Sequence, residues 1–165
     1  MKYIIKPMET HDEINGKAYV HYKSWHETYK GLIADEHLKK ITEELCRSIA
    51  NIWPDNLLVA KDGDRVIGFA GYGKHQDNTL SDCGEVYSLY VLSDYHGQKV
   101  GYELMNAAIE KLTDYKRIAV WVLKGNDRAI NFYKRYGFRF DGTERKTKPD
   151  FKNSKLRMIF ERNKG

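Results

Sequence analysis

The sequence predicts a single α/β domain built on a mixed β-sheet. Hydrophobic spacing alternates between the helical and the strand period, a tight Asp-Gly-Asp turn joins two strand-like segments, and one later apolar run is typical of a strand buried on both faces. The 165 residues suffice for one domain with its own core, and we take 1–165 as that domain. The expected element order is β-α-α-β-β-β-α-β-α-β-β.

The first third of the chain predicts one strand and two helices. Residues 3–6 form the strand, and from Thr10 onward apolar side chains recur at helical spacing until Gly31 ends the helix. A second helix is expected over 38–52. It must end before Pro54, because proline has no amide hydrogen and clashes inside a helix.

The middle of the chain predicts a meander of three strands. Segments 57–61 and 66–72 flank Asp62-Gly63-Asp64, which is typical of a hairpin turn. Segment 85–92, rich in Tyr, Val and Leu, is the third strand. A hairpin meander that leads into a strand–helix–strand crossover requires a sheet with both parallel and antiparallel pairs.

The last third predicts two helices and the remaining strands. Helical spacing covers 97–112, and a second helix over 126–136 begins at the capping residue Asn126 and ends at Gly137, which can take the left-handed conformation. The remaining strands are expected at 118–123, 138–143 and 156–161.

Composition and motifs argue against several protein classes. No apolar run approaches the roughly 20 residues of a membrane helix, and the start of the chain lacks a signal peptide, so we expect a cytoplasmic protein with no membrane partner. Cys46 and Cys83 are far apart and lack metal-site spacing, so free thiols and no metal are expected. The sequence contains no GxSxG elbow, P-loop or HExxH motif.

The chain carries a net charge of +5, with many of its basic residues late in the sequence. A basic surface favours anionic partners such as nucleic acid, phosphorylated cofactors or acidic proteins, and solvated strand and loop faces explain it equally well. A nucleic-acid-binding module is therefore one alternative, although no helix-turn-helix or RNP-type strand pair is present. The late basic residues are Lys134, Arg135, Arg139, Arg145, Lys146, Lys148, Lys152, Lys155 and Arg157.

The segment EVYSLYVLSDYHGQKVGYELM, residues 85–105, runs from a strand through a polar turn into an amphipathic helix. The free amides of a first helical turn, together with the helix dipole, favour an anion such as a pyrophosphate. His96 and Lys99 lie at this helix start, where cations are normally unfavourable and a bound anion would offset the cost. The alternative is that Lys99 extends into solvent and is balanced by Asp94.

The segment NDRAINFYKRYGF, residues 126–138, predicts a second functional helix. Ile130 and Tyr133 share a face, and Ala129 is small enough to allow close approach. Aromatic residues at this spacing commonly belong to a core, so composition alone does not make Tyr133 catalytic.

In this order, the two segments resemble the cofactor-binding motifs of the GNAT superfamily of N-acetyltransferases. The strand EVYSLYVL, the turn SDYHGQKVG, the strand IAVWVL and the helix NDRAINFYKRYGF correspond to successive family elements, and the resemblance covers nearly the whole chain. The segment SWHETYKGLI is also similar to the start of bacterial polyamine and small-amine acetyltransferases. The resemblance implies the GNAT acyl-CoA N-acyltransferase fold, acetyl-CoA as cofactor, and direct acetyl transfer in a ternary complex.

The resemblance also implies a cofactor site. The strand through Leu89, Tyr90 and Val91 is expected to be bulged and to splay from the next parallel strand, so that pantetheine pairs with Leu89 and Val91 and the Val91 amide holds the thioester oxygen. Asn126 and Ala129 would approach the cofactor from the second helix. The pyrophosphate would be wrapped by the turn containing His96, Gly97, Gln98, Lys99, Val100, Gly101 and Tyr102.

The phosphate turn departs from the family pattern at two positions. His96 stands where the family usually has Arg or Gln, and Lys99 replaces a glycine that lets the backbone approach the phosphates. We expect Lys99 to adopt an ordinary helical conformation, and we expect these departures to bear on cofactor affinity.

The resemblance further implies two proton-transfer residues and an acceptor site. Glu85 is the candidate base that deprotonates the amine, directly or through water, and its alternative is a solvated carboxylate at the strand start. Tyr133 matches the tyrosine that returns a proton to the departing thiolate. Trp25 and Tyr29 are candidates for the substrate pocket, with a role in the core as the alternative.

The acceptor is expected to be a small-molecule amine such as a polyamine, or else a protein amine, rather than nucleic acid. A homodimer is compatible with the resemblance, because sheet-edge dimers occur in the family. A protein that binds acetyl-CoA as a sensor without turnover remains the second alternative.

Overall fold

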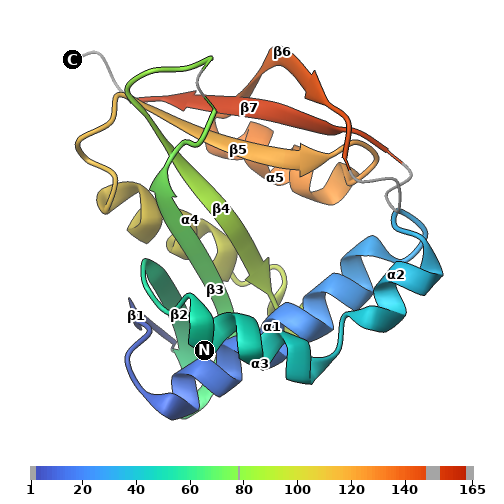
Figure 1. The fold of residues 1–165 in the computed structure, drawn as a ribbon. Helices are drawn as coiled ribbons and strands as arrows, with labels where there is room; N and C mark the ends of the chain where they lie inside the picture. The colour runs from blue at the N-terminus through green and yellow to red at the C-terminus, as the bar shows by residue number, and fades with distance from the viewer. Residues whose placement is uncertain (1–2, 78, 148–152, 163–165) are drawn as a thin grey trace.

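The computed structural model describes residues 3–77, 79–147 and 153–162. Within these ranges seven strands form one sheet in the order β1-β2-β3-β4-β5-β7-β6, in which only the central pair β4–β5 is parallel (Figure 1). The strands are β1 (Ile4–Pro7), β2 (Leu57–Asp62), β3 (Arg65–Lys74), β4 (Cys83–Val91), β5 (Arg117–Leu123), β6 (Arg139–Arg145) and β7 (Lys155–Glu161). The predicted mixed α/β class is confirmed.

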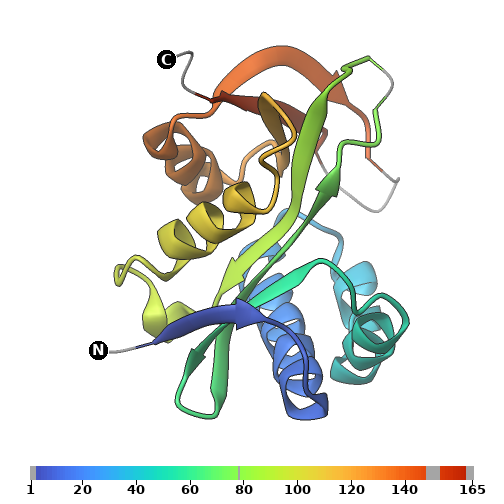
Figure 2. The same ribbon diagram turned by 90° about the vertical axis from the view of Figure 1, so that its left-hand side faces the viewer.

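Helices cover both faces of this sheet. Figure 2 shows α4 and α5 together on one face and the N-terminal helices on the other. The helices are α1 (His11–Tyr29), α2 (Asp35–Lys40), α3 (Glu43–Ile52), α4 (Val100–Glu110) and α5 (Asp127–Tyr136), with a 3₁₀ turn η1 (Ser93–Tyr95). No helix among the described residues combines the length and the apolar character needed to cross a bilayer.

Helix α1 begins with a reciprocal cap centred on Glu13. The Thr10 side chain accepts from the Glu13 amide, while the Glu13 carboxylate accepts from the Glu9 and Thr10 amides. Lys6 and Lys61 donate to the same carboxylate at 2.7 and 3.1 Å. Burial raises the pKa of this carboxyl, but these hydrogen bonds outweigh burial and hold the pKa well below its ordinary value.

We expect Glu13→Gln to lower the free energy of unfolding by about 3 kcal/mol at neutral pH, because it leaves two lysines without their buried carboxylate. The depressed pKa of folded Glu13 means that its stabilisation is present above the unfolded value of about 4.3 and fades as the pH falls below it. Urea denaturation at neutral and acidic pH measures both effects. The control Glu9→Gln should change little, because the Glu9 side chain is 65% exposed.

The predicted helix over 38–52 is wrong in its continuity, because the structure divides it into α2 and α3. The Ile41 amide bonds back to the Leu38 carbonyl and closes α2, and the Thr42 side chain accepts from the Leu45 amide to begin α3. At an N-cap, the threonine side chain accepts a hydrogen bond from an amide of the first helical turn. In one continuous helix that amide would instead donate to the carbonyl four residues earlier.

Turn and cap residues that act locally behave as predicted. Gly63 has a φ of 60° in the β2–β3 hairpin, and Gly137 has a φ of 127° at the end of α5. The Asn126 side chain accepts from the Ala129 amide at the start of α5. These interactions connect neighbouring residues, which explains why the sequence indicates them.

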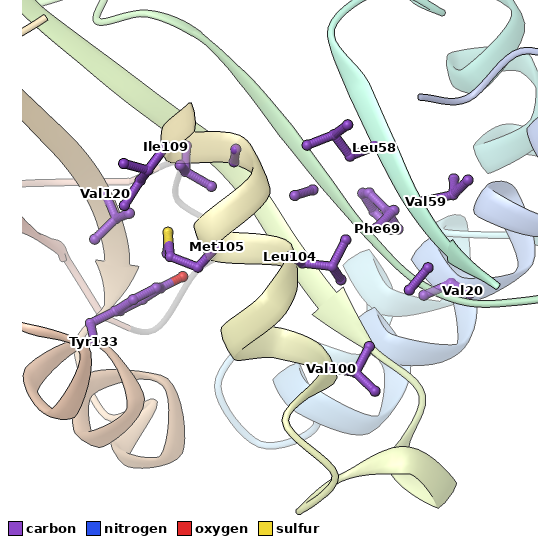
Figure 3. Close-up of a cluster of buried hydrophobic side chains, with 14 of the residues drawn as sticks. Val20, Leu58, Val59, Phe69, Val100, Leu104, Met105, Ile109, Val120 and Tyr133 are labelled. Carbon is purple, nitrogen blue, oxygen red and sulfur yellow. The ribbon is translucent and has the colours of Figure 1, made fainter. Parts of the chain in front are cut away.

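The core places α4 against the centre of the sheet. Met105 lies near Val120 and Tyr133 (Figure 3), and Leu104 faces Gly68 of β3 from the α4 side. The Phe69 ring, next along β3, points to the opposite face, where it meets His21 of α1. The Leu104, Met105 and Val120 side chains are fully buried. This packing fixes the start of α4 beside the strand end of β4.

The late basic residues do not form one continuous exposed stripe. Arg157 is buried and pairs with Asp77 and Asp141, and Arg145 also pairs with Asp77. Lys148 and Lys152 lie outside the described residues. The burial of Arg157 removes one member of the late basic set from the surface.

Candidate functional site

Strands β4 and β5 separate beyond three residue pairs, which opens a gap in the sheet (Figure 1). They pair only from Cys83 to Glu85, opposite 117–119. A register shift against β3 then leaves Tyr87 as an extra residue, because Val86 faces Tyr72 and Ser88 faces Gly71. The bulge and the splay implied by the resemblance are therefore confirmed.

A cavity of about 630 Å³ opens beside this gap, bounded by β4, the turn into α4, α5 and one edge of α1. Most of the predicted cofactor residues line it, but Gln98 does not, and its side-chain amide donates instead to the Asp94 carbonyl at 3.4 Å. The lining residues predicted from sequence are Leu89, Tyr90, Val91, His96, Gly97, Lys99, Val100, Gly101, Tyr102, Asn126, Ala129 and Tyr133.

The turn into α4 differs from the expectation at Lys99. Its φ of 65° and ψ of 14° are left-handed, so the prediction of an ordinary helical conformation is wrong, and α4 begins at Val100 rather than Gly97. A left-handed conformation is strained for a residue other than glycine, so the glycine of the family pattern would fit this turn without strain. His96 steadies the turn by donating from Nε2 to the Val91 carbonyl at 2.9 Å.

The cavity suits an anionic ligand. Lys99, Arg128 and Arg135 line it, whereas Glu27 is the only carboxylate among its described lining residues. The N-termini of α4 and α5 also border the cavity, and such helix ends favour negative charge. Arg128 and Arg135 were not predicted as cofactor residues, although both lie in the segment 126–138 and Arg135 belongs to the late basic set.

Helix α1 contributes a second set of lining residues that the sequence analysis missed. Ser24, Glu27 and Thr28 lie on one face of α1, at the spacing of neighbouring helical turns. The Ser24 hydroxyl is buried and has no hydrogen-bond partner among the described residues. Because an unpaired buried hydroxyl is unfavourable, a polar ligand group in the cavity would relieve this cost. The helical spacing of Ser24, Glu27 and Thr28 is the feature of the sequence that could have indicated this polar face.

Tyr133 belongs both to the core and to the cavity wall. Its ring packs beside Met105 and Val120 (Figure 3), and its side chain also faces the cavity. Burial, with a further contribution from Tyr29, raises the pKa of Tyr133 well above its ordinary value. Tyr133 therefore keeps its proton at neutral pH. Its hydroxyl makes no hydrogen bond to another described residue.

Glu85 lies outside the cavity lining, near the point where β4 and β5 separate. It is 8% exposed, so the alternative of a solvated carboxylate is wrong. Its Oε1 lies 2.7 Å from Nδ1 of His75. Burial raises the pKa of Glu85, against the opposing effects of His75 and Lys155. A carboxyl with a raised pKa is suited to exchange protons near neutral pH.

Trp25 and Tyr29 also lie outside the cavity lining. The centroids of their rings are 4.8 Å apart, and both side chains pack against a small core formed by Ile33, Leu38 and Leu123. The Tyr29 hydroxyl bonds to the Tyr90 hydroxyl at 2.9 Å, which connects this aromatic group to β4. Within the described residues, no group of three or more His, Cys, Asp or Glu side chains is arranged to hold a metal.

Comparisons with known proteins agree with this geometry. Residues 19–138 match the acetyltransferase (GNAT) family. An uncharacterized N-acetyltransferase of Mycobacterium bovis is 32% identical over 89 residues, which cover 53% of this chain and 54% of that relative. A probable spermine N(1)-acetyltransferase of Bacillus subtilis subsp. natto is 29% identical over 87 residues, covering 49% and 57%. The chain thus spans about half the length of these relatives.

The fold also matches solved structures. The PaiA N-acetyltransferase of Thermoplasma acidophilum, solved in complex with coenzyme A, superposes with a TM-score of 0.71 at 18% identity. The match covers 98% of this chain and 100% of that one.

Proposed function

The chain belongs to the acetyltransferase (GNAT) family, and on that basis we propose that it is an N-acetyltransferase that moves the acetyl group of acetyl-CoA to a primary amine. The main support is the cavity beside the splayed strands, where free backbone on β4 meets a cationic turn at the start of α4. A nucleic-acid-binding module would not require free backbone on a splayed strand beside a cationic helix start.

The residues around the cavity fit acetyl-CoA. Lys99, Arg128 and Arg135 would meet its phosphates, and the buried Ser24 hydroxyl would find a partner among its polar groups. When bound, acetyl-CoA supplies an acetyl thioester, which an amine can attack. Leu89 and Val91 border the cavity, and their backbone groups would orient the cofactor along β4.

Two side chains would handle the protons. A lysine-like amine is largely protonated at neutral pH, since its pKa is about 10.4, and it must lose a proton before it attacks. Glu85 would accept that proton, directly or through water. Tyr133 would donate its phenolic proton to the sulfur as the thiol leaves.

The acceptor amine would approach from the side of the sheet that carries Trp25 and Tyr29. We propose these two residues as part of its entrance, because Tyr29 contacts Tyr90 on the strand that borders the cavity. A small amine such as a polyamine is the preferred acceptor, in keeping with the relative whose name is probable spermine N(1)-acetyltransferase.

Calorimetric titration with acetyl-CoA tests the cofactor site. We expect Lys99→Glu to weaken binding by about tenfold or more, because it reverses a charge beside the phosphates. Lys99→Gly should weaken binding less, and it should raise the free energy of unfolding by about 1 kcal/mol because glycine tolerates the left-handed conformation. Equal binding by all three proteins would remove Lys99 from the site. No binding by the wild type would contradict the proposed function.

A further inference from the structure

His75, directly after β3, lies buried between two charged side chains. It is 4% exposed, with Nδ1 at 2.7 Å from Glu85 Oε1 and Nε2 at 3.2 Å from Nη1 of Arg157. Its backbone amide also donates to the Cys83 carbonyl at 2.9 Å, which holds the His75 backbone beside β4.

Arg157 is held too firmly to turn away from His75. It is 4% exposed, and it extends from β7 into a set of acceptors on two other segments. Besides His75, its guanidinium donates to Asp77, Thr79, Asp141 and Thr143. The two carboxylates balance its charge, and burial and charge together keep the guanidinium in one place.

These contacts determine the tautomer of His75. Arg157 can only donate, so Nε2 of His75 must accept and carries no hydrogen. The ring proton is therefore on Nδ1, which donates to Glu85. A doubly protonated ring would place an N–H against the donor of Arg157, so the neutral form satisfies both contacts.

We propose that His75 is a positioning residue, fixed by Arg157 as the neutral Nδ1–H tautomer, which holds Glu85 in place as a carboxylate ready to accept the proton of the amine. The inference rests on the role of Glu85 in the proposed function. A neutral donor orients the carboxylate without neutralising it, so Glu85 keeps the negative charge that a base requires.

Few groups near Glu85 can titrate around neutral pH. Burial raises the pKa of Cys83 to about 11 and raises that of Tyr87, so neither loses its proton there. Lys155 and Arg157 contribute positive charge. The titratable and charged groups facing Glu85 are His75 from the end of β3, Lys155 and Arg157 from β7, and Cys83 and Tyr87 from β4. An acidic limb that persists in the His75→Phe variant would thus report Glu85.

The sign of the effect follows from the hydrogen bond. A base must be ionised, so kcat/KM should fall as the pH drops below the pKa of Glu85. A donor stabilises the carboxylate, and its loss should raise that pKa and move the acidic limb to higher pH.

Two substitutions separate the hydrogen bond from the bulk of the ring. His75→Phe removes the donor, and we expect it to move the acidic limb of kcat/KM upward by about one pH unit. His75→Asn places an amide N–H near the position of Nδ1 and should leave the limb within a few tenths of a unit of the wild type. Thermal unfolding of both variants checks that each one folds.

Nitrogen NMR of ¹⁵N-histidine-labelled wild type reads the tautomer directly. The inference expects a protonated Nδ1 and an unprotonated Nε2 in the folded protein at neutral pH. A proton on Nε2, or an unchanged limb in His75→Phe, would overturn it. An active enzyme whose Glu85→Gln variant keeps its full rate would reject Glu85 as the base, and this inference with it, but not the acetyltransferase function.

A wild type without turnover would reject the proposed function instead. In that case ¹³C titration of the Glu85 carboxyl in wild type and His75→Phe still measures whether His75 lowers the pKa of Glu85. Equal values in the two proteins would also overturn the inference.

Discussion

Replacing Tyr133 by phenylalanine should lower kcat for acetyl transfer by about 10²-fold, which is within the usual range for one general acid. The change removes only the hydroxyl of a residue that lines the cavity, and that hydroxyl makes no hydrogen bond to another described residue. The departing sulfur would then take its proton from water. Steady-state kinetics with saturating acetyl-CoA measures the loss.

The other properties of Tyr133→Phe should stay close to those of the wild type. The ring continues to pack beside Met105 and Val120, so the fold and the calorimetric affinity for acetyl-CoA should change little. Because Tyr133 keeps its proton at neutral pH, the loss should be the same across that range. Tyr19→Phe, on α1 and outside the cavity lining, is the matched control. A kcat near that of wild type would remove Tyr133 from the mechanism.

Replacing Glu85 by glutamine should lower kcat/KM by about 10²- to 10³-fold at neutral pH. Glutamine keeps the shape of the side chain and an oxygen that can accept from His75, so the fold should persist. The variant has no group to take the amine's proton, and the acidic limb of its rate profile should disappear.

The deficit of Glu85→Gln should shrink as the pH rises. A larger fraction of the amine is then deprotonated in solution, up to its pKa of about 10.4 if it is lysine-like, and the missing base matters less. Rate profiles of both proteins with one amine test this. A deficit that is constant with pH would indicate that Glu85 orients the substrate rather than accepting its proton.

Much of the backbone could be predicted because its signals act between neighbours in the chain. The Asp62-Gly63-Asp64 turn, the Asn126 cap and Gly137 each act within about one turn of chain, where a residue's own conformational preferences dominate. The gap between β4 and β5 was implied by the resemblance of its flanking segments to known motifs, and the register of the strands confirms it.

Local signals failed where two conformations compete closely. Thr42 can continue a helix or cap a new one, and the structure selects the cap. Lys99 prefers ordinary helical angles on its own, yet the turn between His96 and α4 places it in the left-handed region. At Thr42 the cap is itself a position that threonine favours, whereas at Lys99 the turn overrides the local preference.

The amino-acid sequence therefore determined the fold class, the order of elements and the two segments that surround the cofactor cavity. Tertiary structure alone decided that Ser24, Arg128 and Arg135 share that cavity. It also joined His75 to Glu85, ten residues away, and to Arg157, 82 residues away. The physical reason is that caps and turns satisfy hydrogen bonds between near neighbours, whereas a buried ionisable side chain must find partners on whichever strands the sheet brings beside it.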